Sequence, residues 1–201
     1  MQRLGVRFDN TQYSSAANWN DTPIGFWALG HKLFQTTQET YPLAFVGGSI
    51  FDPKVVEPIT PFYEPPDSAR PDIKTLTSLN PLHGHVSAIH TASFFHLFDE
   101  AEQLAAARAL ASLLSPEPGS MIFGHHLASA VAHVRPTASL RGKIIYHHSP
   151  ETWKALWDGV VFEKGKVEVW AILRELSEAD TRGLFKSAAK ITIMIWCVKR
   201  L

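Results

Sequence analysis

Histidine is the residue type whose chemistry and frequency first suggest a reactive site in this sequence. The chain has ten histidines among 201 residues, and an imidazole can bind a metal ion or exchange a proton near neutral pH. No His-x3-His pattern falls on one predicted helix and no cysteine lies nearby, so no standard zinc motif is present. Solvent-facing or hydrogen-bonded imidazoles are therefore favoured over a metal site. The histidines concerned are His83, His85, His90, His96, His125, His126, His133, His147 and His148.

Two of these histidines, His90 and His96, flank the carboxyl end of a predicted buried strand, Val86 to Ile89. Ligands of open α/β sheets bind at that end of the strands. His96 could act there as a general base on a phenol or a carboxylic acid. The alternative is that His96 caps or packs against the helix that follows, and the sequence favours this structural role without excluding the other.

Several other kinds of chemistry have no support in the sequence. It contains neither the Gly-x-Ser-x-Gly elbow of α/β-hydrolases nor a P-loop for nucleotide hydrolysis. Ser149 precedes Pro150 and is predicted to cap a helix rather than to act as a nucleophile. Lys plus Arg and Asp plus Glu both total 19, a balance that exerts no general attraction toward nucleic acid or an anionic membrane.

The cysteine content and the first residues predict the compartment. Cys197 is the one cysteine of the sequence, so no internal disulfide can form, which is typical of a reducing environment. Residues 1–20 are polar and have no apolar core of the kind that a secretory signal needs. These features predict a cytoplasmic protein without a membrane partner.

The helical and strand patterns alternate, which predicts an α/β fold with a mostly parallel sheet and an antiparallel edge strand. Thr22-Pro23 begins a predicted helix that ends near Gln35, and Asp99 with Glu102 forms a predicted capping box for a second helix. The predicted strands are Leu43 to Val46, Val86 to Ile89, Met121 to Phe123, Val167 to Ala171 and Ile191 to Val198.

The remaining segments are predicted to be loops. Residues 1–21 have no clear period and are expected to form an N-terminal arm or loop before a single domain, residues 22–201. Residues 53–82 hold seven of the prolines, which predicts a long surface loop. Residues 127–145 are predicted to be another loop. Both long loops are expected to cover a ligand pocket.

Residues 84–126 carry a family resemblance. Their sequence, GHVSAIHTASFFHLFDEAEQLAAARALASLLSPEPGSMIFGHH, resembles the fourth strand, the following helix and the fifth strand of a class I S-adenosylmethionine-dependent methyltransferase. The phrase from Ala92 to Phe98 is similar to that of fungal enzymes of secondary metabolism, including those that methylate meroterpenoid precursors. The resemblance extends more weakly over residues 22–201 and implies a Rossmann-like sheet.

This resemblance implies S-adenosyl-L-methionine as the cofactor and a small hydroxyl- or carboxyl-bearing metabolite as the methyl acceptor. It also implies positions for individual residues. Ser49 and Ile50 would lie beside the adenine, His90 and Thr91 under the methionine part of the cofactor, and Phe95 and His96 at the acceptor, with His96 as the catalytic candidate. From their spacing alone, Phe94, Phe95 and Phe98 fit either the core or a pocket wall.

Two departures from the family pattern leave alternatives open. The glycine-rich turn and the acidic ribose ligand of the family should precede Thr22, yet Gly5 is the only glycine among residues 1–21. Ser49 replaces the usual Asp. The sequence therefore resembles the C-terminal three quarters of such an enzyme, with a sheet incomplete on its first-strand side. The alternatives to an active enzyme are an inactive relic or incomplete gene model, and a binding module in a homo- or hetero-oligomer that covers an exposed sheet edge.

Overall fold

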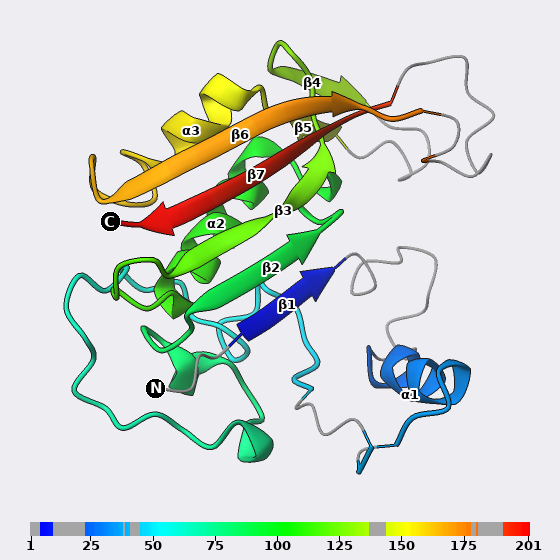
Figure 1. Ribbon diagram of the computed structural model, residues 1–201, viewed down its shortest axis with the longest axis vertical. Helices are drawn as coiled ribbons and strands as arrows, with labels where there is room; N and C mark the ends of the chain where they lie inside the picture. The colour runs from blue at the N-terminus through cyan, green and yellow to red at the C-terminus, as the bar shows by residue number, and fades with distance from the viewer. Residues whose placement is uncertain are drawn as a thin grey trace.

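A twisted β-sheet with helices packed behind it forms the frame of the protein (Figure 1). The computed structural model describes residues 5–9, 23–37, 39–40, 45–136, 144–177, 180 and 191–201. Within that part of the chain, five strands form the main sheet in the order β1-β2-β3-β7-β6, and two more form a separate hairpin. In chain order the sheet strands are β1 (Gly5–Asp9), β2 (Ala88–Ala92), β3 (Met121–Leu127), β6 (Val167–Glu175) and β7 (Thr192–Arg200).

The direction of the strands confirms the predicted α/β class. β1, β2 and β3 pair in parallel, whereas β7 pairs antiparallel with both β3 and β6. β6 consequently runs in the same direction as β1, β2 and β3, so the sheet is mostly parallel. The reversed strand is β7, which lies between β3 and β6 and is not itself the edge that the sequence suggested.

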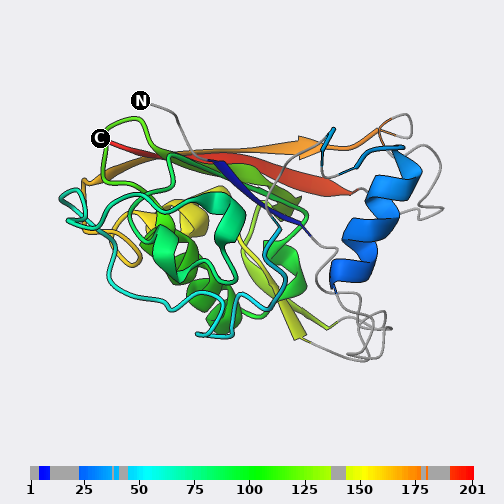
Figure 2. The same cartoon turned by 90° about the horizontal axis from the view of Figure 1, so that it is seen from below.

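Two helices cover one face of the sheet. α2 (Glu100–Leu113) and α3 (Pro150–Trp157) lie side by side below it, whereas α1 (Pro23–Leu33) lies beyond one end of the strands (Figure 2). The predicted capping box of α2 is confirmed, because the Glu102 amide donates to Asp99 Oδ1 at 2.8 Å and the Asp99 amide donates to Glu102 Oε2 at 3.2 Å. Ser149 caps α3 as predicted.

The core lies between the sheet and this helix layer. Ile89, Ile122 and Val198 project from neighbouring strands and are fully buried. Aromatic rings fill the space beneath β7, where Trp153 and Trp157 of α3 approach Trp196 with ring centroids 4.9 and 6.0 Å away. Burial of large rings of this kind supplies much of the hydrophobic stabilisation of a domain.

Two predicted loops contain strands. Gly5–Asp9, within the expected N-terminal arm, forms β1 beside β2, and the expected loop at 127–145 contains β4 (His133–Pro136) and β5 (Ile144–His147). The loop prediction is wrong for these residues because such short segments become strands through their partners, a tertiary effect that local sequence does not reveal. The place beside β2 expected to be empty is thus filled by β1.

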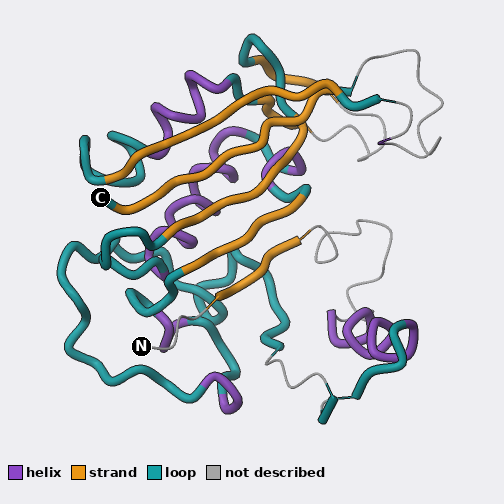
Figure 3. Tube along the Cα trace, in the orientation of Figure 1, coloured by secondary structure: helices purple, strands orange, loops and turns teal. Residues whose placement is uncertain are grey.

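Two further predictions can be compared with the structure. Residues 53–82 form a long loop with two short 3₁₀ turns, Ile73–Thr75 and Asn80–Leu82 (Figure 3). Of the predicted strand Leu43 to Val46, residues 43–44 lie outside the described residues, and residues 45–46 are not in a strand.

Candidate functional site at the carboxyl ends of the central strands

The turn that follows the carboxyl end of β2 has an unusual backbone conformation. Ser93 directly follows the strand and has a φ of 51°, a left-handed conformation that costs a non-glycine residue of order 1–3 kcal/mol. Its amide donates to the carbonyl of His125 at the end of β3, at 2.8 Å. The strained turn thus lies where ligands of open α/β sheets bind. The sequence did not indicate Ser93, because serine has no strong preference for this conformation.

Gln103 fixes the turn to α2 and to the β4–β5 hairpin. Its side chain is fully buried, and its Nε2 donates to the carbonyl of Phe98 at 3.1 Å and to that of Tyr146 at 2.7 Å. The Tyr146 amide also donates to the Phe98 carbonyl, at 3.0 Å. One amide side chain therefore joins three elements around this edge. A polar residue in an apolar helical stripe was the available signal for it.

Four histidines gather beside this turn. His126 is buried among aromatic rings, with its ring centroid 4.7 Å from that of Trp153. Its Nδ1 accepts a hydrogen bond from Trp196 Nε1 at 2.9 Å, which places the proton of the neutral ring on Nε2. His148 Nδ1 pairs with Thr152 Oγ1 at 3.0 Å. His96 and His147 complete the group on the 3₁₀ turn Phe95–Leu97 and on β5.

Burial keeps these imidazoles uncharged. It lowers the pKa of His96, His147 and His148 to about 4, and neighbouring histidines and Arg135 add to the effect at His96 or His147. Burial, followed by the charges of nearby histidines, also holds the pKa of His126 well below 6.5. A base works best when its pKa is near the operating pH, so a neutral His96 suits hydrogen bonding better than proton abstraction.

The same four rings carry buried nitrogens without a partner. His96 Nδ1 and Nε2 of His126, His147 and His148 have no hydrogen-bond partner among the described residues. Buried polar atoms normally have one, in protein or ordered water. The described chain holds no group of three or more His, Cys, Asp or Glu side chains arranged to bind a metal. This cluster is therefore a place for water or a polar ligand group.

The structure separates the residues predicted to contact the cofactor. Thr91 is 1% exposed and faces the helix-covered side, whereas His90, its neighbour in β2, faces the opposite side with its ring 5.0 Å from Phe123. Successive strand residues point to opposite faces, so the two side chains do not point into one shared pocket. Ile50 is 3% exposed and belongs to the core. Ser49 is half-buried, and its Oγ accepts from the Phe51 amide at 3.2 Å.

The loop that contains Ser49 does approach the turn after β2. Phe51 contacts Phe98 edge-on with ring centroids 5.1 Å apart, which brings the loop that contains Ser49 to the turn after β2. Phe95, expected to face the acceptor, is instead fully buried, with its ring centroid 4.8 Å from that of Trp153. It therefore contributes to the core.

S-adenosylmethionine can be tested against these positions. The buried side chains of Ile50 and Thr91 offer it almost no surface, and the His90 side chain points to the opposite face from Thr91. In a doubly wound sheet the strand beside β2 leads into the glycine-rich turn. Here that strand is β1, and Asn10-Thr11-Gln12 follow it without glycine and lie outside the described residues. The described residues therefore do not fit this cofactor in the predicted manner.

Part of the proline-rich loop lies at the opposite ends of the sheet strands. The guanidinium of Arg200, near the C-terminal end of β7, donates to the carbonyl of Phe62 and lies 4.9 Å from the ring centroid of Tyr63. Because β7 is reversed, this end lies at the amino ends of the parallel strands. The expectation that residues 53–82 cover a ligand pocket at the carboxyl ends is thus wrong for this part of the loop.

Comparison with known proteins confirms the family resemblance. The chain is 29% identical over 161 residues to the O-methyltransferase phiE of a fungal species, a match that covers 80% of this chain and 45% of that protein. It is 32% identical over 98 residues to the asnovolin E/chermesin D methyltransferase nvfJ of Aspergillus novofumigatus, covering 46% and 34%. The chain thus spans less than half the length of these relatives. No family profile matches it.

The solved structures add no functional argument. A methyltransferase from Mesorhizobium loti, described as S-adenosylmethionine-dependent, is 11% identical and has a TM-score of 0.35, with 59% of this chain and 64% of that chain covered. The sequence relatives instead show that this chain is similar to fungal methyltransferases over part of their length. In the described part of the chain, no helix is long and apolar enough to cross a membrane.

Proposed function

We propose that the protein takes part in S-adenosylmethionine-dependent methyl transfer to a small hydroxyl- or carboxyl-bearing metabolite. The observation that carries this proposal is the match to the O-methyltransferase phiE over 80% of the chain. The strained Ser93 turn and the polar atoms around it, at the carboxyl ends of β2 and β3, support it. The comparisons do not favour the alternatives of an inactive relic or a partner module.

The described residues suit a positioning role. A methyl transferase mainly aligns two reactants, since the cofactor supplies both the methyl group and the leaving group. A carboxylate acceptor needs no base, whereas a hydroxyl acceptor benefits from one. Neutral His96 can hold a polar group near the reaction centre by a hydrogen bond, and this is its proposed role. Ser49 and His90 stay candidates for cofactor contacts.

Titration of the purified chain with S-adenosylmethionine and with its demethylated product tests cofactor binding. We expect weak binding, because the glycine-rich turn and the acidic ribose ligand are missing from the sequence. Each lost hydrogen bond of this kind costs about 1–3 kcal/mol, and every 1.4 kcal/mol is about tenfold in affinity. Micromolar affinity would contradict this expectation and would show that other residues replace the missing contacts.

An assay of methyl transfer from labelled cofactor, at millimolar concentration, tests the activity itself. We expect transfer to hydroxyl or carboxyl compounds and a reduced rate for His96→Asn. The matched control is His133→Asn, which changes an exposed histidine of β4. If neither kind of compound is methylated at saturating cofactor, the proposed function is wrong.

A further inference from the structure

A cavity of about 690 Å³ opens between α2, α3 and the β4–β5 hairpin. This volume is within the usual range of small-molecule pockets. Asp99, the N-cap of α2, lies on its wall, as does His148, which directly follows β5. The cavity therefore begins beside the carboxyl ends of the sheet strands, next to the turn described above.

The walls of this cavity are mainly apolar. Leu104 of α2 and Leu156 of α3 line it from the helix layer. Val134 and Ile144 line it from the hairpin and are 57% and 54% exposed, and Val160 adds another exposed apolar side chain. Apolar side chains with this exposure around one concave surface favour a ligand that is itself largely apolar.

The polar groups of the cavity share one electrostatic character. Asp99 and Glu100 are the charged side chains on its wall, and no Lys or Arg lies among its lining residues in the described chain. Burial, followed by the charge of Glu100, raises the pKa of Tyr146, which also lines the cavity. His148 adds no positive charge at neutral pH, since burial lowers its pKa to about 4.

We propose that this cavity binds a largely apolar molecule that carries a hydroxyl group, and that it discriminates against carboxylates. A hydroxyl can donate a hydrogen bond to Glu100 or to Tyr146 Oη, whereas a carboxylate would lie beside two negative charges with no cation to pair with. Insofar as the ligand is the methyl acceptor, this inference rests on the proposed function and selects a hydroxyl over a carboxyl acceptor.

Binding of three biphenyl probes to the full chain, measured by calorimetry without any methyl donor, tests this inference. We expect 4-phenylphenol to bind roughly tenfold or more tightly than biphenyl-4-carboxylate, and more tightly than 4-methoxybiphenyl, which lacks the donor. Equal or tighter binding of the carboxylate would overturn the inference. Because no cofactor is present, failure of methyl transfer with retained phenol binding would count against the proposed function alone.

Two pairs of variants locate the site. Glu100→Gln should strengthen carboxylate binding several-fold without a comparable gain for 4-phenylphenol, whereas Glu151→Gln, on the first turn of α3 and outside the cavity lining, should change neither. Ala155→Trp should abolish binding of every probe by filling the cavity. Its neighbour Lys154 is exposed and does not line the cavity, so Lys154→Trp should leave binding intact. Unchanged binding in Ala155→Trp would show that the probes bind elsewhere.

Discussion

The two faces of the main sheet differ sharply although the same strands build both. The face toward α2 and α3 buries Trp196, Val198 and Met194 of β7 almost completely. On the opposite face, Trp170 and Ile172 of β6 are 50% and 43% exposed. Parallel sheets usually carry helices on both faces, yet in the described part of the chain α2 and α3 both lie on one side (Figure 2).

This difference shows where the stability of the described domain arises. Side chains alternate between the two faces along each strand, and apolar residues occur on both faces. Only the face covered by helices gains the full free energy of apolar burial. The polar site belongs to the covered side too, because His126 and His148 pack against Trp153 of that core. The open face contributes solvent-exposed apolar surface instead. Changes to the covered face should therefore dominate the stability of the protein.

Acid should produce the largest effect on the covered face. His96 and His148 have a pKa of about 4 in the folded state, against about 6.5 when unfolded. The unfolded state then binds more protons between these values, so stability is complete above pH 6.5 and falls as the pH drops toward 4. Proton uptake by each of these histidines in the unfolded state should lower the free energy of unfolding by about 2 kcal/mol between pH 7 and pH 5.

Urea unfolding at pH 7, 6 and 5 measures this loss. The variants His96→Asn and His148→Asn should each flatten the dependence of unfolding free energy on pH. A midpoint that stays constant over this range would mean that the imidazoles are accessible to water, and the covered face would then be less sealed than the structure shows.

Paired tryptophan substitutions compare the faces directly. Trp157→Ala should destabilise the protein by about 3–5 kcal/mol, the usual cost of deleting a large buried aromatic side chain, because Trp157 is fully buried against Trp196. Trp170→Ala, on the open face, should cost less than about 1 kcal/mol. Both values come from urea midpoints at pH 7. Similar losses for the two variants would remove the difference between the faces.

Gly124 offers a test of how closely the covered side is packed. A Cβ atom at this position of β3 would lie 1.7 Å from the carbonyl oxygen of Thr91 in β2, a contact that only backbone movement can relieve. Gly124→Ala should therefore destabilise the protein by about 3 kcal/mol, near the upper end for overpacking. Gly119→Ala is a control in a loop with open space around it, although its positive φ adds strain. Equal stability of Gly124→Ala and the parent would show that the strands can separate at no cost.

Much of the frame could be predicted because its signals are local. Asp99 with Glu102, and Ser149 with Pro150, are helix starts whose hydrogen bonds involve residues three apart, so the sequence alone reveals them. The apolar run around Ile89 similarly predicts a buried strand, although β2 begins at Ala88, two residues after the predicted start. Val86 makes only an isolated bridge to Leu114.

The site was less predictable because it depends on contacts between distant segments. His96 was found from its place after a strand, but its surroundings come from β5, whose strand character arises from pairing with β4. Phe95 and His96 are adjacent in sequence, yet Phe95 lies in the core while the sequence left core and pocket wall open. The opposite directions of the His90 and Thr91 side chains follow from strand alternation and could have been predicted. The left-handed conformation of Ser93 could not have been predicted, because serine has no strong preference for it.

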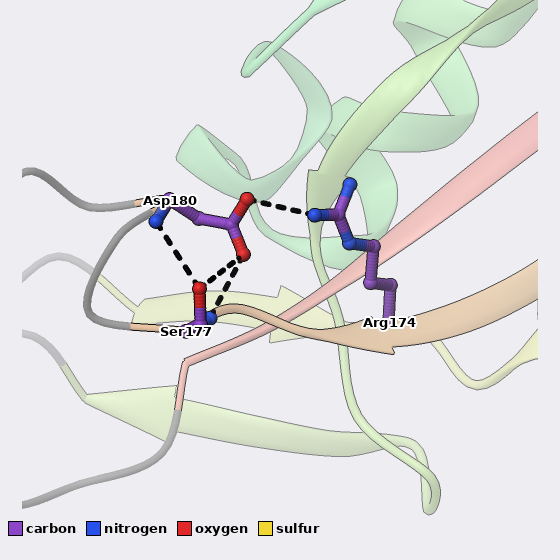
Figure 4. A network of polar contacts seen from close by, with 3 residues as sticks. All are labelled: Arg174, Ser177 and Asp180. Atoms are coloured by element: carbon purple, nitrogen blue, oxygen red, sulfur yellow. Dashed lines mark hydrogen bonds and ion pairs between the residues drawn. The ribbon is translucent and has the colours of Figure 1, made fainter.

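The smallest effect is expected where the sheet meets solvent, just beyond β6. Asp180 accepts hydrogen bonds from the amide and the hydroxyl of Ser177, at 2.9 and 2.8 Å, and from Arg174 at 2.7 Å (Figure 4). The bonds to Ser177, more than the charge of Arg174, hold the pKa of Asp180 below its usual range. Such a site is solvated, so the attraction of its ion pair is screened and is offset by the cost of ordering the side chains.

Arg174→Ala should therefore leave the urea midpoint at pH 7 unchanged within error, whereas Asp180→Ala, which removes all three bonds, should lower it slightly. A larger loss for Arg174→Ala than for Asp180→Ala would contradict this ranking, because Arg174 would then stabilise the open side of the sheet through contacts other than Asp180.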